Sequence, residues 1–445
     1  MTTLNQCGIG EGAFESRTIR KLRMRVLPFI FVLFVVALLD RVNIGFASLT
    51  MNRELGITSQ QYGLIFGIFF FGYFFFEIPS NLLMHKVGAR IWIARILISW
   101  GMVAILTGFV RTVHQLYMVR FLLGLAEAGY FPGITLYLTY WFPQREQARA
   151  LALLIAAIPI TAILGAPLSG VILDHVHWLG VSSWRWLLIL EGTPALAGGV
   201  FTYFLLPGCP QEAKFLTADE KEWIRTELGR EEQQKLEQRR YTALQALSCG
   251  RVWHLVLIYF GMTTGNYALQ SWAPQLVKSL SSGYSNSTIG LLVTIPNLVG
   301  LAAMIFVSRS SDRTLERRYH VAISAIVGAA SLVLLCATRS PFYSVALLCL
   351  LAAGIYSSCG PFWALPSEFL TGYSAAAGIA LINSVGNLGG FVGPYTIGRI
   401  ATRTGNPYGG LAIAGVLLFM SAILVLLLPR KVGAISAFRD KHAEL

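Results

Sequence analysis

The stretch that decides the fold is "VLPFIFVLFVVALLDRVNIGFAS", residues 26–48. A helix needs about 20 predominantly apolar residues to cross the hydrocarbon core of a bilayer, and this stretch is long enough to do so. Two adjacent charged residues, Asp40 and Arg41, interrupt it. Charges inside a membrane helix are costly unless they are paired or face water, and they usually mark a functional site. The stretch therefore predicts a membrane helix that carries functional charges.

The rest of the chain repeats this apolar pattern. Of its 445 residues, 55% are hydrophobic and 13% are charged, whereas soluble proteins carry about 25% charged residues. Apolar windows separated by polar breaks predict twelve membrane helices. The first six span 26–48, 61–83, 91–110, 116–137, 150–173 and 186–206, and the second six span 253–275, 289–308, 320–337, 342–366, 376–398 and 408–428.

A charged segment divides these helices into two sets of six. Its core, "QEAKFLTADEKEWIRTELGREEQQKLEQRR" (211–240), mixes both signs of charge and predicts a solvated helix. Two sets of six helices predict two pseudo-repeated bundles with a substrate site between them. The expected divisions are an N-terminal tail 1–25, a first bundle 26–206, a linker 207–252, a second bundle 253–428 and a C-terminal tail 429–445.

Basic residues orient the chain. The net charge of +13 comes mainly from short segments between apolar stretches, a pattern that is typical of cytoplasmic loops rather than of nucleic-acid binding. Arg399 and Arg403 depart from the pattern. The majority predicts a multi-pass protein of the inner (plasma) membrane with both termini in the cytoplasm. The residues that define this side include Arg17, Arg20, Lys21, Lys86, Arg90, Arg145, Arg149, Arg309, Arg313, Arg317 and Arg318.

Charged residues in two of the predicted helices share a depth. Asp40, Arg41 and Arg120 fall in the same depth range, with Glu127 deeper in the membrane. Arg120, Gly124 and Glu127 are spaced i, i+4 and i+7, so they share one helix face. We interpret this face as a cavity wall, with Gly124 leaving room for the charged side chains. The alternative is that these charges neutralise each other and only hold helices together.

Two further acids inside membrane helices have a structural interpretation. Glu77 precedes Pro79, and Glu191 lies in "WRWLLILEG" (184–192). We interpret Glu77 as structural and Glu191 as a packing or gating contact. Asn43 lies three residues after Asp40 on the same helix face, where it can orient the acid.

Four stretches resemble a known family. "LLDRVNIGFA" (38–47), "EIPSNLLMHKVGAR" (77–90), "RFLLGLAEAGYFPG" (120–133) and "INSVGNLGGFVGP" (382–394) resemble signatures of the anion:cation symporter family within the major facilitator superfamily. Bacterial permeases for sugar acids, such as rhamnonate and galactonate, and for aromatic acids, such as hydroxyphenylacetate, are similar. The resemblance implies an all-α membrane protein with twelve transmembrane helices in two six-helix bundles.

The resemblance also implies roles for individual residues. Asp40 and Glu127 would be the proton-coupling pair. Residues that would bind substrate are Arg41, Arg120, Tyr73, Asn43, Asn266, Tyr267, Gln270, Trp363, Asn383 and Asn387. Lys86, Arg90, Asp312 and Arg313 would belong to the gating loops. His85 stands where the superfamily usually has an aspartate.

These observations predict a secondary active transporter that imports a small organic carboxylate by proton symport through alternating access. Protonation of Asp40 and Glu127 would free the charge of Arg41 and Arg120 for a substrate carboxylate, which arginine binds through two parallel hydrogen bonds. The expected partners are an organic anion, protons and the lipid bilayer, with no nucleic acid. No cofactor is expected, and the protein is expected to be a monomer.

Other functions remain open. An uncoupled anion exchanger or facilitator would need no buried acids, and a drug–proton antiporter would gain little from two membrane arginines. A membrane enzyme or nutrient sensor is a further alternative. The chain has no HExxH, GxSxG or phosphate-binding loop motif, and its six cysteines lack metal-ligand spacing. We therefore expect no catalytic or metal site.

Overall fold

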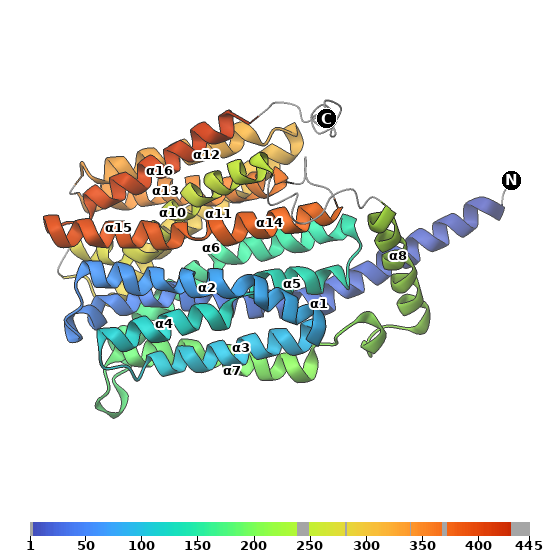
Figure 1. Ribbon diagram of the computed structural model, residues 1–445, viewed down its shortest axis with the longest axis horizontal. Helices are drawn as coiled ribbons and strands as arrows, with labels where there is room; N and C mark the ends of the chain where they lie inside the picture. Colours follow the sequence, from blue (N-terminus) through green and yellow to red (C-terminus); the bar gives the residue numbers. More distant parts are fainter. Residues whose placement is uncertain (1–2, 238–248, 281–282, 339, 367–371, 429–445) are drawn as a thin grey trace, which may run out of the picture.

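The computed structural model describes residues 3–237, 249–280, 283–338, 340–366 and 372–428 (Figure 1). Helices make up nearly all of this part of the chain, and no strand occurs within it. The predicted C-terminal tail (429–445) and the middle of the predicted linker lie outside the described residues.

The helices form two groups with a charged helix between them. The first group is α1 (Thr3–Glu54), α2 (Ser59–Val87), α3 (Ala89–Thr107), α4 (Val113–Glu127), α5 (Tyr130–Thr139), α6 (Gln144–His175) and α7 (Ser183–Leu205). Helix α8 (Ala218–Glu237) follows. The second group is α10 (Gly250–Leu280), α11 (Asn286–Thr314), α12 (Arg318–Leu335), α13 (Pro341–Ala364), α14 (Gly372–Gly386), α15 (Gly389–Thr404) and α16 (Tyr408–Leu426).

The two groups form two bundles that lie side by side with their helices roughly parallel (Figure 1). Equivalent pairs pack in each bundle: α3 lies along α7 as α12 lies along α16. Between the bundles, α2 packs along α15 and α6 packs along α11. Helix α8 and the N-terminal part of α1 lie at one end, which we call the linker end; the other is the opposite end.

The composition of the helices fits a membrane. Ten segments are long and apolar enough to cross one, among the residues that the structure describes. Helix α10, which is less apolar, and the pair α14 and α15, which have 15 and 16 residues, are not among them. With these two, the described helices provide the predicted twelve membrane crossings in two bundles.

Two of the predicted helices are broken where a single helix was expected. The expected helix 116–137 ends as α4 at Glu127, passes through an extended Ala128 and restarts as α5 after Gly129, whose φ is +85°. A left-handed backbone suits glycine, and a Cβ at Gly129 would also lie 2.3 Å from Ser80 Oγ. The expected helix 376–398 is divided into α14 and α15 at Asn387 and Leu388.

Glycines bring the two bundles together at the opposite end. A Cβ on Gly63 of α2 would lie 2.4 Å from the carbonyl oxygen of Pro394 on α15, and one on Gly290 of α11 would lie 2.4 Å from that of Ala166 on α6. Only glycine allows backbones to approach this closely. The opposite end is therefore closed by direct backbone contact.

A carboxylate strengthens this closed end. Asp174, near the end of α6, accepts hydrogen bonds from the backbone N–H of Asn286 at 3.1 Å and of Ser287 at 2.7 Å. The side chains of both residues also donate to it. Asp174 thus caps the first turn of α11, where unpaired N–H groups favour an anion.

Helix α8 is held against the first bundle by charged contacts. Lys21 Nζ lies 2.8 Å from Glu220 Oε2, and Arg90 lies 3.5 Å from Glu212 just before α8. Burial would raise the pKa of Glu220, but hydrogen bonds from Lys21 and Thr217 and the charge of Lys21 hold it below its usual value. These contacts fix the described part of the linker to α1 and α3.

Candidate functional site

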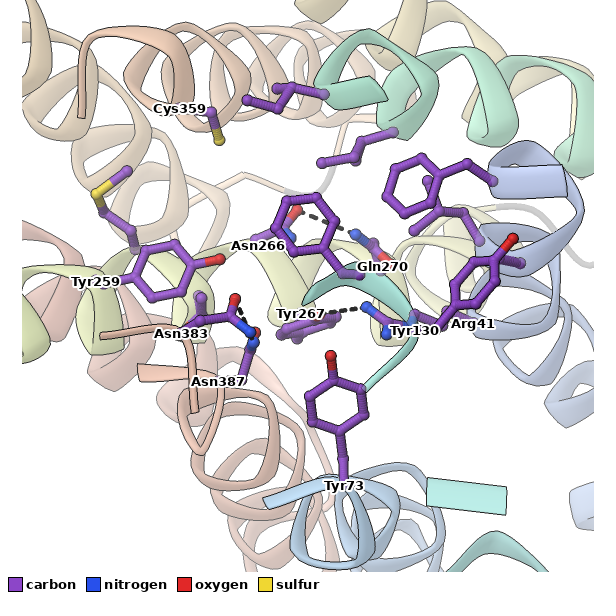
Figure 2. A pocket seen from close by; sticks show the side chains of 18 of the residues that line it. Arg41, Tyr73, Tyr130, Tyr259, Asn266, Tyr267, Gln270, Cys359, Asn383 and Asn387 are labelled. Carbon is purple, nitrogen blue, oxygen red and sulfur yellow. Dashed lines mark hydrogen bonds between the residues drawn. The ribbon is translucent and has the colours of Figure 1, made fainter. Parts of the chain in front are cut away.

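A cavity of about 110 Å³ lies between the two bundles (Figure 2). Holding one water molecule takes roughly 10–15 Å³, so the cavity has room for a small organic molecule. Its polar lining residues from the first bundle are Arg41, Tyr73, Glu127 and Tyr130, and those from the second are Tyr259, Thr263, Asn266, Tyr267, Gln270, Cys359, Trp363, Asn383 and Asn387. Apolar side chains such as Phe34, Ile155 and Ile355 complete the wall.

Arg41 is the central charged group of the cavity wall. One guanidinium nitrogen forms an ion pair with Glu127 of α4, and the other donates to Tyr267 Oη of α10 at 3.3 Å. Arg41 thus links the two bundles across the cavity. Its Nε and Glu127 Oε2 are both buried without a protein partner. Arg41 Nε–H can therefore donate a hydrogen bond to a molecule that enters the site, and Glu127 Oε2 can accept one.

One aromatic ring lies close to both membrane arginines. The guanidinium carbons of Arg41 and Arg120 lie 5.5 Å and 5.6 Å from the centre of the Phe69 ring, and Arg41 lies 5.7 Å from the ring of Tyr73. Ring faces attract cations and stabilise a guanidinium that has left water. This holds both cations in place without neutralising them.

Three of the predicted site residues lie behind the cavity wall. Asp40, Asn43 and Arg120 are 2%, 1% and 3% exposed and do not line the cavity. Asn43 Nδ2 donates to Asp40 Oδ1 at 2.9 Å, as its position predicts. Arg120 interacts electrostatically with Asp40 but forms no ion pair within the described residues. These residues can reach the cavity only through Arg41 and Glu127 or after a rearrangement.

The interpretation of Gly124 as cavity space is wrong. A Cβ there would lie 2.0 Å from the carbonyl oxygen of Phe69, so Gly124 lets α4 contact the backbone of α2. The shared face of α4 is therefore a helix interface with Glu127 at its cavity edge.

The second bundle supplies amides and aromatic rings. Gln270 donates to Asn266 Oδ1 at 3.1 Å, and Asn387 donates to Asn383 Oδ1 at 3.1 Å. Each pair uses one donor and one acceptor, and Asn383 Nδ2 donates to Glu77. The Nδ2 of Asn266 and the carbonyl oxygens of Gln270 and Asn387 take no part in these bonds and suit the hydroxyl groups of a substrate. Tyr259 and Trp363 meet edge to face with ring centres 5.0 Å apart and form the aromatic side of the cavity.

The two acids interpreted as structural have clear partners. Glu191 accepts a hydrogen bond from Ser169 of α6 at 2.8 Å and joins α7 to α6, which agrees with a packing role. Glu77 is 1% exposed and accepts from Asn383 Nδ2 at 2.8 Å and from the Ser384 hydroxyl. Glu77 therefore joins the two bundles beside the cavity.

The predicted gating residues lie at the linker end, away from the cavity. Lys86 is exposed, and Arg90 pairs with Glu212. Asp312 forms an ion pair with Arg317 of the same bundle at 2.6 Å, and Arg313 is exposed. In this structure none of these four residues bridges the two bundles. The side chain of His85 lies outside the described residues.

Sequence reasoning missed several lining residues. Tyr259, Thr263 and Cys359 line the cavity, as does Tyr130 directly after the α4–α5 break. Tyr259 and Thr263 precede Asn266 and Gln270 at helical spacing, so extending that face by two turns would have found them. Cys359 and Tyr130 carry no such signal. No cluster of possible metal ligands occurs in the part of the chain that was described.

Two helix bundles around a buried, partly charged cavity define a membrane transporter. The family model for the Major Facilitator Superfamily matches residues 29–394. The chain is 45% identical to a putative tartrate transporter of Agrobacterium vitis, covering 95% of this chain and 94% of that protein. It is 38% identical to a quinolone resistance transporter of Acinetobacter baumannii, covering 92% and 94%.

A solved structure shares the fold. It is a bacterial homolog of the human lysosomal transporter Spinster in an inward-facing, occupied conformation, with a TM-score of 0.73, 14% identity and coverage of 91% of this chain and 96% of that one. The chain belongs to the major facilitator superfamily. It is a multi-pass membrane transporter and not an enzyme, as its sequence predicts.

Proposed function

We propose that the protein imports a small hydroxylated carboxylate together with protons, and that tartrate is the first substrate to test. The observation that carries this proposal is Arg41, a cation on the cavity wall whose partner Glu127 has an unpaired oxygen. A substrate carboxylate can take the place of Glu127 on the guanidinium fork. The 45% identity to a putative tartrate transporter supports the choice of substrate.

Coupling to protons follows from charge balance. With Asp40 and Glu127 ionised, the charges of Arg41 and Arg120 are offset, and an anion entering the cavity would add an unbalanced charge in a poorly solvated place. Binding a proton at Glu127 releases Arg41 for the substrate. An anion and a proton then enter the cavity together from one side of the membrane. Both leave when the cavity opens to the opposite side of the membrane.

Alternating access is supported by the contacts between the bundles. Glycine contacts and the Asp174 cap close the opposite end, while α2 contacts α14 only slightly towards the linker end. We propose that the linker end faces the cytoplasm of a bacterial inner membrane, because Arg17, Lys21 and Arg90 gather there. The cavity is complete within one chain, which supports a monomer.

The test is uptake of labelled tartrate by proteoliposomes under an inward proton gradient. Accumulation is expected to disappear with a protonophore. In Glu127→Gln the amide can still accept from Arg41 but cannot release a proton, so exchange of internal for external tartrate is expected to persist while accumulation is lost. Full accumulation by this variant would contradict proton coupling at Glu127. Uptake unaffected by the protonophore would favour an uncoupled facilitator.

A second candidate is drug–proton antiport, which the quinolone resistance relative favours. The same proteoliposomes can be loaded with norfloxacin and given an opposing proton gradient. Proton-driven efflux of norfloxacin without tartrate uptake would replace the proposal of anion import with antiport.

A further inference from the structure

Glu77 lies in an unusual position for a carboxyl group. It is 1% exposed inside α2, one turn from Tyr73 towards the linker end. Both of its oxygens accept hydrogen bonds from the other bundle: Asn383 Nδ2 donates to one at 2.8 Å, and the hydroxyl of Ser384 donates to the other. Asn383 also lines the cavity, so one side chain connects the cavity to the contact between the bundles.

Glu77 has no ion-pair partner within the described part of the chain. The titratable or charged groups that face it are Tyr73 on α2 itself, Arg41 on α1 and Tyr259 on α10. From α14 only uncharged donors reach it. Hydrogen-bond donors favour a carboxylate whereas burial disfavours it, and a proton can be gained or lost at Glu77 without breaking an ion pair.

The contact lies where α2 and the second bundle meet only slightly. At the opposite end, α2 and α15 touch through Gly63 and Gly398, whose added Cβ atoms would lie 2.4 Å and 2.2 Å from backbone oxygens. Towards the linker end, α2 meets α14 only slightly. The hydrogen bonds of Glu77 therefore contribute a large part of what holds these two helices together on that side of the cavity.

We propose that Glu77 is a further proton-carrying residue of the transport cycle and acts between the bundles. As a carboxylate it holds α14 to α2 through Asn383 and Ser384. When it takes a proton from water, the charge-assisted hydrogen bonds become neutral ones of roughly half the strength, and the linker ends of the bundles separate. The proposal rests on the proposed function only in taking the proton as the coupling ion.

Two variants separate the charge from the hydrogen bonds. In Glu77→Gln the side-chain carbonyl can accept from Asn383 and the amide can donate to Ser384, so the shape remains while the charge is lost. In Ser384→Ala the charge remains and one donor is lost. Spin labels at Val87→Cys and Thr314→Cys report the distance between the bundles at the linker end. Labels at Leu179→Cys and Arg403→Cys report the opposite end as a control.

The measurement is pulsed electron-spin resonance on the full-length protein in detergent, without substrate. The native cysteines Cys7, Cys209, Cys249, Cys336, Cys349 and Cys359 are replaced by serine. Spectra are compared between about pH 8 and about pH 5, a range in which buried carboxyls titrate. Circular dichroism and size-exclusion chromatography show whether each variant is folded.

In the wild type, the fraction of molecules with separated linker ends is expected to rise as the pH falls. Glu77→Gln is expected to have a larger separated fraction than the wild type at high pH and less than half of its pH response. Ser384→Ala is expected to be more separated at high pH but to keep the response. The proposal would be overturned if the separated fraction of the wild type did not change with pH. It would also be overturned if Glu77→Gln had the wild-type separated fraction at high pH, or if its separated fraction changed with pH as much as that of the wild type.

Because no substrate is present, this result is independent of the identity of the transported molecule. Failure of tartrate uptake would overturn the proposed substrate and leave the role of Glu77 standing. Conversely, a Glu77→Gln protein that behaves like the wild type leaves proton-coupled uptake through Glu127 unaffected.

Discussion

Arg41 contacts both bundles at the cavity, through Glu127 on one side and Tyr267 on the other. Its value to a transporter depends on the shape of its guanidinium group as well as on its charge. A planar fork binds a carboxylate through two parallel hydrogen bonds, whereas a lysine ammonium binds it as a point charge. The residue can therefore hold a substrate in a fixed orientation between the bundles.

Arg41→Lys tests this dependence on shape. The charge remains, but one charge-assisted hydrogen bond of about 1.5–3 kcal/mol is lost, which corresponds to roughly 10- to 100-fold weaker binding of tartrate. Isothermal titration calorimetry on the purified protein measures the affinity. The matched control is Arg149→Lys on the exposed surface of α6, for which unchanged affinity is expected. Equal affinities of Arg41→Lys and wild type would contradict a bidentate role.

At the residue scale, the sequence identified which charged residues form the centre of the site, but it predicted their arrangement less well. Helical rise placed Arg41 at the depth of Arg120 with Glu127 deeper in the membrane, whereas the structure pairs Arg41 with Glu127. Burial of Asp40 and Arg120 behind the wall could not be predicted, because it depends on how α4 rotates against α2. Gly124 allows that close packing of α4 on α2. The sequence alone does not tell whether a glycine leaves room for a cavity or lets two helix backbones approach.

Helix α2 shows how a single element depends on glycine. Gly63 faces the carbonyl oxygen of Pro394, and the added methyl group of Gly63→Ala would lie 2.4 Å from it. The variant is expected to push α15 away, lengthen the distance between labels at Leu179→Cys and Arg403→Cys, and lower the transport rate. Gly229→Ala on α8 is the control, since nothing lies within 4 Å of its added Cβ. An unchanged label distance in Gly63→Ala would show that α2 and α15 are not tightly packed.

The docking of helix α8 against the first bundle depends on charge. The pKa of Glu220 is held below its usual value by its contacts with Lys21 and Thr217, so its contribution to docking is present above the usual pKa and lost as the pH falls through the lowered value. Glu220→Gln is expected to leave α8 more accessible to limited proteolysis at neutral pH. Acidification should increase the cleavage of α8 in the wild type and increase it little further in the variant. Equal cleavage rates at neutral pH would contradict this docking role.

At the element scale, apolar windows located every membrane helix among the described residues but missed two breaks. The windows around 116–137 and 376–398 are apolar enough to be read as continuous helices. In the first, Gly129 has a left-handed backbone and lacks the Cβ that would meet Ser80 on α2, and no local sequence pattern carries this tertiary constraint. Both breaks adjoin residues that line the cavity, Glu127 and Asn387. Interrupted helices commonly occur at the binding sites of transporters.

The whole molecule has one end rich in positive charge and one closed by glycine contacts. This asymmetry predicts orientation in the cell. A membrane-impermeant maleimide is expected to label Leu179→Cys in intact cells and Thr314→Cys only after the membrane is opened, in the cysteine-free background. Both positions are exposed at opposite ends of the helices. Labelling in the reverse order would place both termini outside the cytoplasm.

Two bundles of six helices could be predicted from the sequence because apolar length and the charged linker are both local features. The end at which the bundles touch could not be predicted. That contact depends on glycines such as Gly170 and Gly398, which face a backbone far away in the sequence. In the sequence, these glycines cannot be told from the many others in the chain. Only the structure shows which of them contact a distant backbone.

The backbone contacts at the opposite end have a consequence for the environment in which the protein works. Backbones that touch through Gly63, Gly170, Gly290 and Gly398 carry no net charge for dissolved ions to screen. The linker end, in contrast, is lined by ion pairs that weaken as ionic strength rises. Salt should therefore loosen the docking of α8 at the linker end while leaving the glycine contacts between the bundles unchanged. The two ends of the protein would then respond differently to the ionic strength of the compartments that they face.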